Sequence, residues 1–209
     1  IDRGGPRGYD FGLMRKNKRS ILAFIFTGHL LFAVGCIPKM TAEQIRQFQP
    51  ERPAELDRLN MFLGEWETTG TIELAMLDEP IATSGRNRAA WTLDGCVLED
   101  HADLDMGPFG RVRGKTMWAW DAALGKYRMW WFDTLGETSE VVATFNERTD
   151  TWRMKAKGQK YGRHTSGRGT IRRIDENTLE WTWNEASASG LIRFAKMSGT
   201  SRRVGSSGG

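Results

Sequence analysis

Cysteine is scarce in this sequence: Cys36 and Cys96 are the two among 209 residues. Two cysteines do not by themselves establish a disulfide, and Cys36 has a separate explanation given below. Cys96 is then a lone thiol within a predicted strand. Such a thiol is more often a small buried hydrophobe than a nucleophile.

An excess of positive charge is also missing from most of the chain, although the formal net charge is +4. Six of the 30 Lys and Arg residues and two of the 26 Asp and Glu residues precede Cys36. The remainder therefore carries 24 residues of each sign. This balance removes the electrostatic case for binding DNA or RNA, and we expect no nucleic-acid partner.

Recognisable catalytic motifs are absent. The sequence contains no His-Glu-x-x-His, P-loop or dinucleotide-binding pattern. Four metal-ligand side chains alternate along one predicted strand, but residues on one straight strand cannot converge on a single ion. These are Glu99, His101, Asp103 and Asp105, and they predict a solvated outer face. We expect no catalytic set, no metal and no cofactor.

The first 36 residues read as a leader. Residues 1–13 show no periodicity and are interpreted as an upstream extension, with translation starting at Met14. A basic segment from Arg15 to Arg19 then precedes an apolar run over residues 21–34. That run is short for a membrane span and contains His29, so residues 14–36 are predicted to be a signal peptide.

The end of this leader, Ala33-Val34-Gly35-Cys36, resembles the lipobox of bacterial lipoproteins. The resemblance implies that Cys36 is acylated and becomes the mature N-terminus, which anchors the protein to a membrane. Ile37 rather than Asp follows this cysteine, which by resemblance to Gram-negative sorting rules implies the periplasmic face of the outer membrane. Residues 37–53 are then a tether.

The period of the apolar residues changes after the tether. Leu56, Leu59, Phe62 and Leu63 have helical spacing, so a short helix is expected over residues 54–63. From Trp66 onward the period is two, interrupted by turn residues. The predicted strands are 66–75, 85–93, 96–106, 112–120, 126–134, 139–146, 151–157, 168–174, 178–185 and 192–204. Residues 205–209 are expected to be a flexible tail.

The segment 117–133 is the centre of this pattern, with four of the nine Trp residues. It predicts a hairpin whose second strand is apolar on both faces. About ten short antiparallel strands without intervening helices favour an all-β closed barrel. A barrel of this size over residues 54–204 is wide enough to enclose a small ligand.

Gly64-Glu65-Trp66 resembles the Gly-x-Trp opening of calycins, the superfamily of lipocalins and fatty-acid-binding proteins. The resemblance implies that Trp66 closes the barrel base against an arginine of the last strand, Arg202 or Arg203. A second set of motifs resembles a bacterial family catalogued as domain of unknown function fifteen-seventy-nine. It comprises Gly107-Pro108-Phe109-Gly110, Gly114, Trp120-Asp121, Lys126-Tyr127, Trp131 and Asp133-Thr134.

The parity of the aromatic residues suggests a ligand site inside the barrel. Neighbouring strands present matched faces, so one aromatic set is expected to line the lumen. It comprises Trp118, Trp120, Tyr127, Trp131, Trp152, Trp181 and Trp183. Arg128 is either the internal cation that holds a ligand carboxylate or an external arginine stacked on Trp130. We expect a lipid-anchored envelope protein that binds a small hydrophobic or amphipathic ligand, such as a fatty acid. The alternatives are a packed structural lipoprotein and an enzyme with an unrecognised pocket.

The leader generates a first prediction. Cys36→Ser should move the protein from the membrane fraction to the soluble fraction of a bacterial host, because the acylated thiol is lost. Fractionation followed by immunoblotting measures this, with Cys96→Ser as the matched control that stays membrane-bound. A Cys36→Ser variant that remains in the membrane fraction would contradict the lipoprotein interpretation.

Overall fold

The computed structural model describes residues 39–46 and 51–205. The predicted extension, the signal peptide with Cys36, and residues 206–209 lie outside these described residues. A five-residue helix, α1 (Ala42–Arg46), begins with a reciprocal cap in which Thr41 and Gln44 each accept from the other's backbone N–H. Within the described parts of the chain, no helix is long and apolar enough to cross a membrane.

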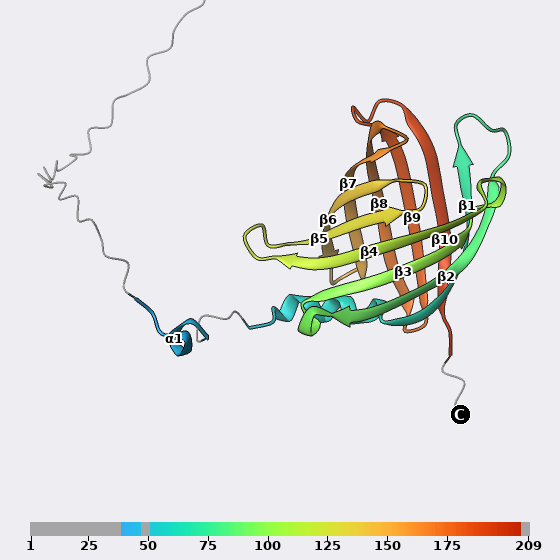
Figure 1. The fold of residues 1–209 in the computed structure, drawn as a ribbon. Helices are drawn as coiled ribbons and strands as arrows, with labels where there is room; N and C mark the ends of the chain where they lie inside the picture. Colours follow the sequence, from blue (N-terminus) through green and yellow to red (C-terminus); the bar gives the residue numbers. More distant parts are fainter. Residues whose placement is uncertain (1–38, 47–50, 206–209) are drawn as a thin grey trace, which may run out of the picture. The chain divides into compact units, whose positions relative to one another are not determined.

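The rest of the described chain forms a closed antiparallel barrel of ten strands (Figure 1). The strands follow one another around the barrel in chain order, and β1 pairs with β10 to close it. They are β1 (Gly64–Leu74), β2 (Ile81–Thr92), β3 (Val97–Asp105), β4 (Arg111–Asp121), β5 (Lys126–Asp133), β6 (Thr138–Asn146), β7 (Thr151–Lys160), β8 (Arg163–Asp175), β9 (Thr178–Ser187) and β10 (Arg193–Arg203).

The predicted all-β closed barrel is confirmed, and most strands begin and end within two or three residues of the expected positions. The largest difference is at β8, which starts at Arg163 although residues 158–167 were expected to be a connection. The glycines of this segment do not interrupt pairing: Gly158 and Gly167 both belong to the β7–β8 ladder. The hairpin turn is reduced to Tyr161 and Gly162, both with positive φ.

The segment before β1 folds as a 3-10 helix, η1 (Ala54–Phe62), rather than an α-helix. Its apolar residues Leu56, Leu59 and Phe62 recur every three positions, and a 3-10 helix aligns residues at that spacing in one row. Leu56 and Leu59 are almost completely buried. In Figure 1 this helix (cyan) lies across the lower end of the barrel.

Trp152 on β7 is the centre of the packing at this lower end, the base of the barrel. Its side chain is fully buried, and its ring lies 4.7 Å from Tyr127, 5.5 Å from Trp118 and 5.7 Å from Phe62. The mostly edge-on and tilted arrangements are those that aromatic quadrupoles favour. Tyr127 also donates its hydroxyl to a backbone carbonyl of η1, which joins the helix to the barrel wall.

Arg203 fastens the same end from the last strand. Its guanidinium lies 4.3 Å from the centre of the Trp66 ring and donates hydrogen bonds to the carbonyls of Leu63 and Met61. Trp66 is buried and donates its indole N–H to the carbonyl of Phe62 at 2.8 Å. Arg203 therefore occupies the place against Trp66, while its neighbour Arg202 is exposed.

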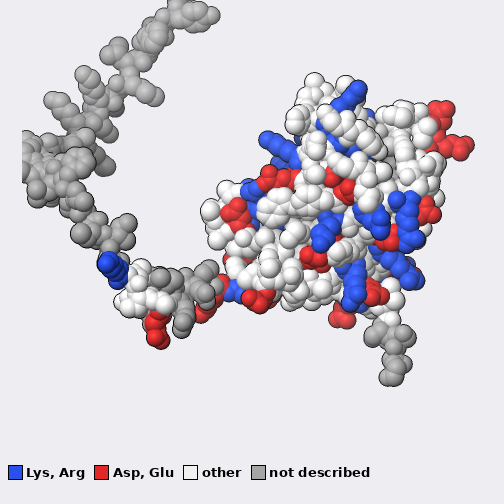
Figure 2. All heavy atoms as spheres, viewed as in Figure 1, with Lys and Arg blue, Asp and Glu red and all other residues white. Residues whose placement is uncertain are grey.

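The outer face of the barrel is charged and mixed, with Lys and Arg interspersed among Asp and Glu (Figure 2). Glu99, His101 and Asp103 face outward; Glu99 pairs with Lys115 at 3.0 Å. The expectation of a buried Cys96 is wrong: this free cysteine is exposed in the turn before β3. The turn needs left-handed backbone at Asp94 and Gly95, and β3 starts only at Val97.

The two adjacent arginines of β10 provide a matched test of the base. Arg203→Ala should lower the free energy of unfolding by about 2 kcal/mol or more, because it removes a cation–π contact and charged hydrogen bonds to carbonyls. Arg202→Ala should change it by no more than about 0.5 kcal/mol, as for other exposed positions. Chemical denaturation measures both, and equal effects would contradict the role given to Arg203.

Candidate functional site

A cavity of about 360 Å³ lies inside the barrel. Phe62, Trp66 and Trp118 line it on the side of the aromatic base. Its walls are mostly apolar side chains from the inward faces of the strands. This size and lining are typical of sites for small organic ligands.

The structure divides the predicted aromatic set into two groups. Trp118, Trp131, Trp181 and Trp183 line the cavity. Trp120, Tyr127 and Trp152 face the interior but belong to the packed base, where Trp120 and Tyr127 have ring centres 4.8 Å apart. Four of the seven aromatic residues are therefore placed to contact a ligand, and three support the base.

Of the two placements open for Arg128, the internal cation is wrong and the external arginine beside Trp130 is the one that the structure shows. Its guanidinium pairs with Glu140 and lies 3.4 Å from Asp121 and 5.7 Å from the ring of Trp130. All of these contacts are on the outer face of the barrel, because Tyr127 and Met129 take the inward positions of β5. Arg128 therefore lies on the face of β5 opposite Tyr127 and Met129, as the alternation of side chains along a strand requires.

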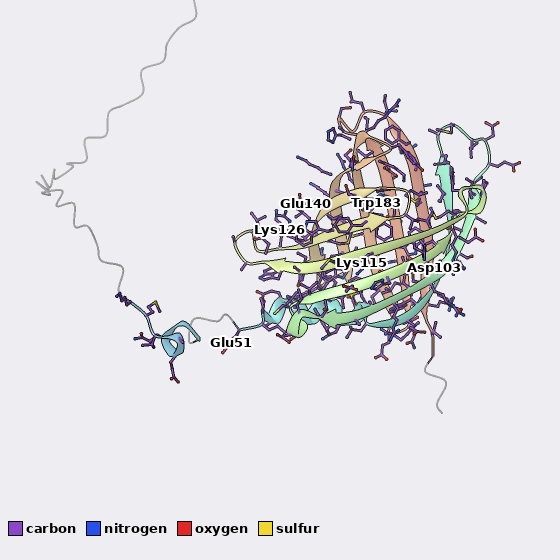
Figure 3. The ribbon with its side chains drawn as sticks, viewed as in Figure 1. Glu51, Asp103, Lys115, Lys126, Glu140 and Trp183 are labelled. Carbon is purple, nitrogen blue, oxygen red and sulfur yellow. The ribbon has the colours of Figure 1, made fainter. Side chains whose placement is uncertain are left out.

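The indoles that line the cavity lie against glycines of adjacent strands. A methyl group placed on Gly114 would come within 2.1 Å of the Trp131 ring, and one on Gly167 within 2.2 Å of Trp183. A methyl on Gly70 or Gly199 would likewise meet Trp181, at 2.9 and 2.5 Å. Figure 3 labels Trp183, which projects from β9 into the barrel interior.

This arrangement keeps the lumen open. A residue with a Cβ at Gly114 or Gly167 would force the neighbouring indole toward the barrel axis, into the space that is now a cavity. The glycines thus let bulky aromatic side chains cover the wall without filling the interior. Small barrels also often alternate small and large residues on their inner face, in their case to fit the taper of the barrel.

A directional chain of hydrogen bonds crosses one wall of the cavity. Asn87 donates to Asp100 Oδ2 at 3.1 Å and accepts from the hydroxyl of Thr68. Because Thr68 gives its proton to Asn87, Ser201 must donate to Thr68 across their 2.8 Å contact. Every donor in the chain therefore points toward Asp100.

Asp100 is the last acceptor of this series of hydrogen bonds, and in the described part of the chain one of its two carboxylate oxygens has no donor. Its Oδ1 is buried and has no hydrogen-bond partner among the described residues. Burial raises the pKa of this carboxyl, and the hydrogen bond from Asn87 opposes the shift. The side chain lines the cavity together with Asn87 and Thr68. An unpaired buried carboxylate oxygen is costly, which marks this position as one that a ligand group can satisfy.

A second polar group is formed farther around the barrel by residues of the β5–β6 turn, β7 and β9. Lys160 Nζ lies 2.8 Å from Glu137 Oε2 and 3.5 Å from Glu185 Oε2. Burial alone would lower the pKa of Lys160, but the two carboxylates outweigh it and the net shift is upward. Burial raises the pKa of Glu185, and Lys160 opposes this. Glu185 Oε1 is buried without a partner in the described structure.

Sequence analysis missed both polar groups. Asp100 shares the inward parity of Leu98 and Ala102, and that signal was available from the strand pattern. Lys160 and Glu137 were harder to find, because Lys160 is the last residue of β7 and Glu137 lies in the turn before β6. Their meeting with Glu185 depends on the side-by-side pairing of β6 to β9.

Within the described part of the chain, no group of three or more His, Cys, Asp or Glu side chains is placed to hold a metal ion. What the cavity offers is a set of flat aromatic surfaces and carboxylate acceptors. Such a lining can bind a planar apolar body and orient a polar group attached to it.

Comparison with solved structures identifies the fold. The chain is similar to Rv2717c from M. tuberculosis, with a TM-score of 0.59 and 14% identity over 74% of this chain and 100% of that chain. It is also similar to the S-type phycobiliprotein lyase CPES from Guillardia theta, with a TM-score of 0.53 and 11% identity over 74% and 95% of the two chains. The fold is a calycin-like barrel.

No protein-family model and no curated protein matches the chain in sequence. The resemblance to the family of domain fifteen-seventy-nine therefore stays a prediction.

The contact between Gly114 and Trp131 generates a prediction about the cavity wall. Gly114→Ala should lower the free energy of unfolding by about 1–3 kcal/mol, as overpacking does in other interiors. The three atoms nearest the added methyl all belong to the Trp131 ring. In a Trp131→Leu background the same substitution should therefore cost much less. A double-mutant cycle by chemical denaturation measures the coupling, and additive effects would contradict the packing described here.

Proposed function

We propose that the barrel binds a small, flat, largely apolar molecule in its lumen. The observation that carries this proposal is the open cavity of about 360 Å³ whose wall indoles are held back by glycines. Removing apolar ligand surface from water drives such binding, at about 25 cal/mol per Å² of area buried. Indole faces and edges add specific contacts to a planar ring.

The alternative of a packed scaffold has less support. A scaffold has no need for space above its aromatic base, and a well-packed interior leaves few voids larger than a water molecule. Here four tryptophans line the space instead of filling it. The cavity thus stays empty because Gly114, Gly167 and the other wall glycines leave room for the indoles against the wall.

The end of the barrel opposite η1 is the proposed entrance for an apolar ligand. Among residues 51–205, no second helix of comparable length covers that end. Four of its five hairpins carry exposed large apolar side chains near their tips: Met76, Leu77, Phe109, Tyr161, Leu191 and Ile192. An apolar rim of this kind is typical of surfaces that meet a hydrophobic partner or ligand.

The proposed setting is the bacterial envelope, with the barrel held at the periplasmic face of the outer membrane through Cys36. The lipobox-like sequence supports this part of the proposal. A membrane-anchored barrel with an apolar cavity is suited to carrying a molecule that is poorly soluble in water. Its test is the fractionation of the Cys36→Ser variant described above.

Ligand binding can be tested with the neutral probe 9-anthracenemethanol, which absorbs where tryptophan emits. Titration into the purified barrel should quench tryptophan emission saturably at micromolar concentration, because four indoles line the cavity. Met129→Trp should abolish or strongly weaken the effect, since it enlarges a side chain that already lines the lumen.

Arg128→Ala is the matched control, because Arg128 lies on the outer face of the same strand. This variant should bind the probe like the wild type. Absence of saturable quenching in the wild type would overturn the proposed function. Equal quenching in Met129→Trp would place the probe outside the lumen and overturn it as well.

A further inference from the structure

We infer that the ligand of this cavity carries a positive charge or several N–H donors, and not a carboxylate. The inference rests on the proposed function and specifies the class of molecule that the lumen accepts. It reverses the expectation of a fatty acid held by an internal arginine. The charged side chains that line the cavity carry the argument.

Carboxyl groups outnumber cations on the cavity wall. Asp100, Asp133, Glu137 and Glu185 line the cavity, whereas Lys160 is the single lysine or arginine of the described residues that does so. Lys160 already lies between Glu137 and Glu185. The lumen therefore has no cation left over for a ligand anion.

Glu185 provides the first acceptor. It is 5% exposed, and its Oε1 has no hydrogen-bond partner within residues 51–205. Its other oxygen is 3.5 Å from Lys160, which lies closer to Glu137. One ammonium shared between two carboxylates leaves negative charge in a site screened from water, where charges interact strongly.

Asp100 provides the second acceptor, on another part of the wall. The hydrogen bonds run from Ser201 through Thr68 to Asn87, whose amide N–H donates to Oδ2 of Asp100. Oδ1 is left for a donor that these residues do not supply. A ligand N–H or ammonium would complete the hydrogen bonding of this carboxylate, whereas a ligand carboxylate would meet like charge.

Arginines elsewhere in the barrel do not offset the negative charge of the lumen. Arg128 and Arg111, which might otherwise offset the carboxylates, pair on the outer face with Glu140 and Asp103 respectively. Arg203 lies at the base, where its N–H groups are used by backbone carbonyls. Burying a ligand anion beside unpaired carboxylates would be strongly unfavourable.

Three probes that share one ring system test the inference. They are 9-(aminomethyl)anthracene as the cation, 9-anthracenemethanol as the neutral reference and 9-anthraceneacetate as the anion. Titration at neutral pH, followed by quenching of tryptophan emission, should give affinity in the order cation, neutral, anion. The cation should bind at least about tenfold more tightly than the anion, a difference that a single ionic hydrogen bond can supply.

Single substitutions identify the carboxylates responsible. Asp100→Asn and Glu185→Gln should each narrow the difference in affinity between the cationic and the anionic probe. Asp103→Asn is the matched control, because it removes the same charge from the outer face of the same strand as Asp100. This variant should leave unchanged both the order of the three affinities and the difference between the cation and the anion.

The possible failures are distinguishable. If the neutral probe binds saturably but the cation and anion bind equally, or the anion binds better, the inference is overturned and the proposed function stands. If no probe binds, both fall. If Asp103→Asn narrows this difference as much as Asp100→Asn and Glu185→Gln, the preference comes from overall charge, and the assignment to the lumen is overturned.

Discussion

The contact between Arg203 and Trp66 is the constraint on which the barrel depends. It joins the last strand to the first and, through the carbonyls of Met61 and Leu63, fixes the chain that leads from η1 into β1. With η1 held in place, the aromatic base forms around Trp152. The packing energy of the protein is thus concentrated at one end, which allows the remainder of the interior to stay open.

The open part of the barrel depends on a second kind of fit, between large and small residues on adjacent strands. Trp131 lies over Gly114, and Trp183 over Gly167. The indoles gain apolar burial against the wall, while the glycines give up the side-chain packing that a strand interior normally uses. The balance favours a lined cavity over a filled core, which is the physical basis for regarding the barrel as a binding protein.

The polar groups of the lumen then decide what can be bound. Buried hydrogen-bond acceptors without donors are rare in folded proteins because each costs free energy. Here two such oxygens, on Asp100 and Glu185, belong to residues that line one cavity. A ligand that supplies the missing donors would recover that cost, so the same groups that destabilise the empty barrel would select its ligand.

The sequence by itself determined the strands, because alternating side chains and Gly or Asp turns act locally. It also determined that Trp118, Trp131, Trp181 and Trp183 belong to one set of inward positions. Arg128 alternates with Tyr127 and Trp131 along β5, so its outward position follows from the same parity. Tertiary structure alone supplied the partners Asp121 and Glu140 that hold it there. It also brought Glu137, Lys160 and Glu185 together, because these residues come from the β5–β6 turn, β7 and β9 and meet only when those segments lie side by side in the sheet.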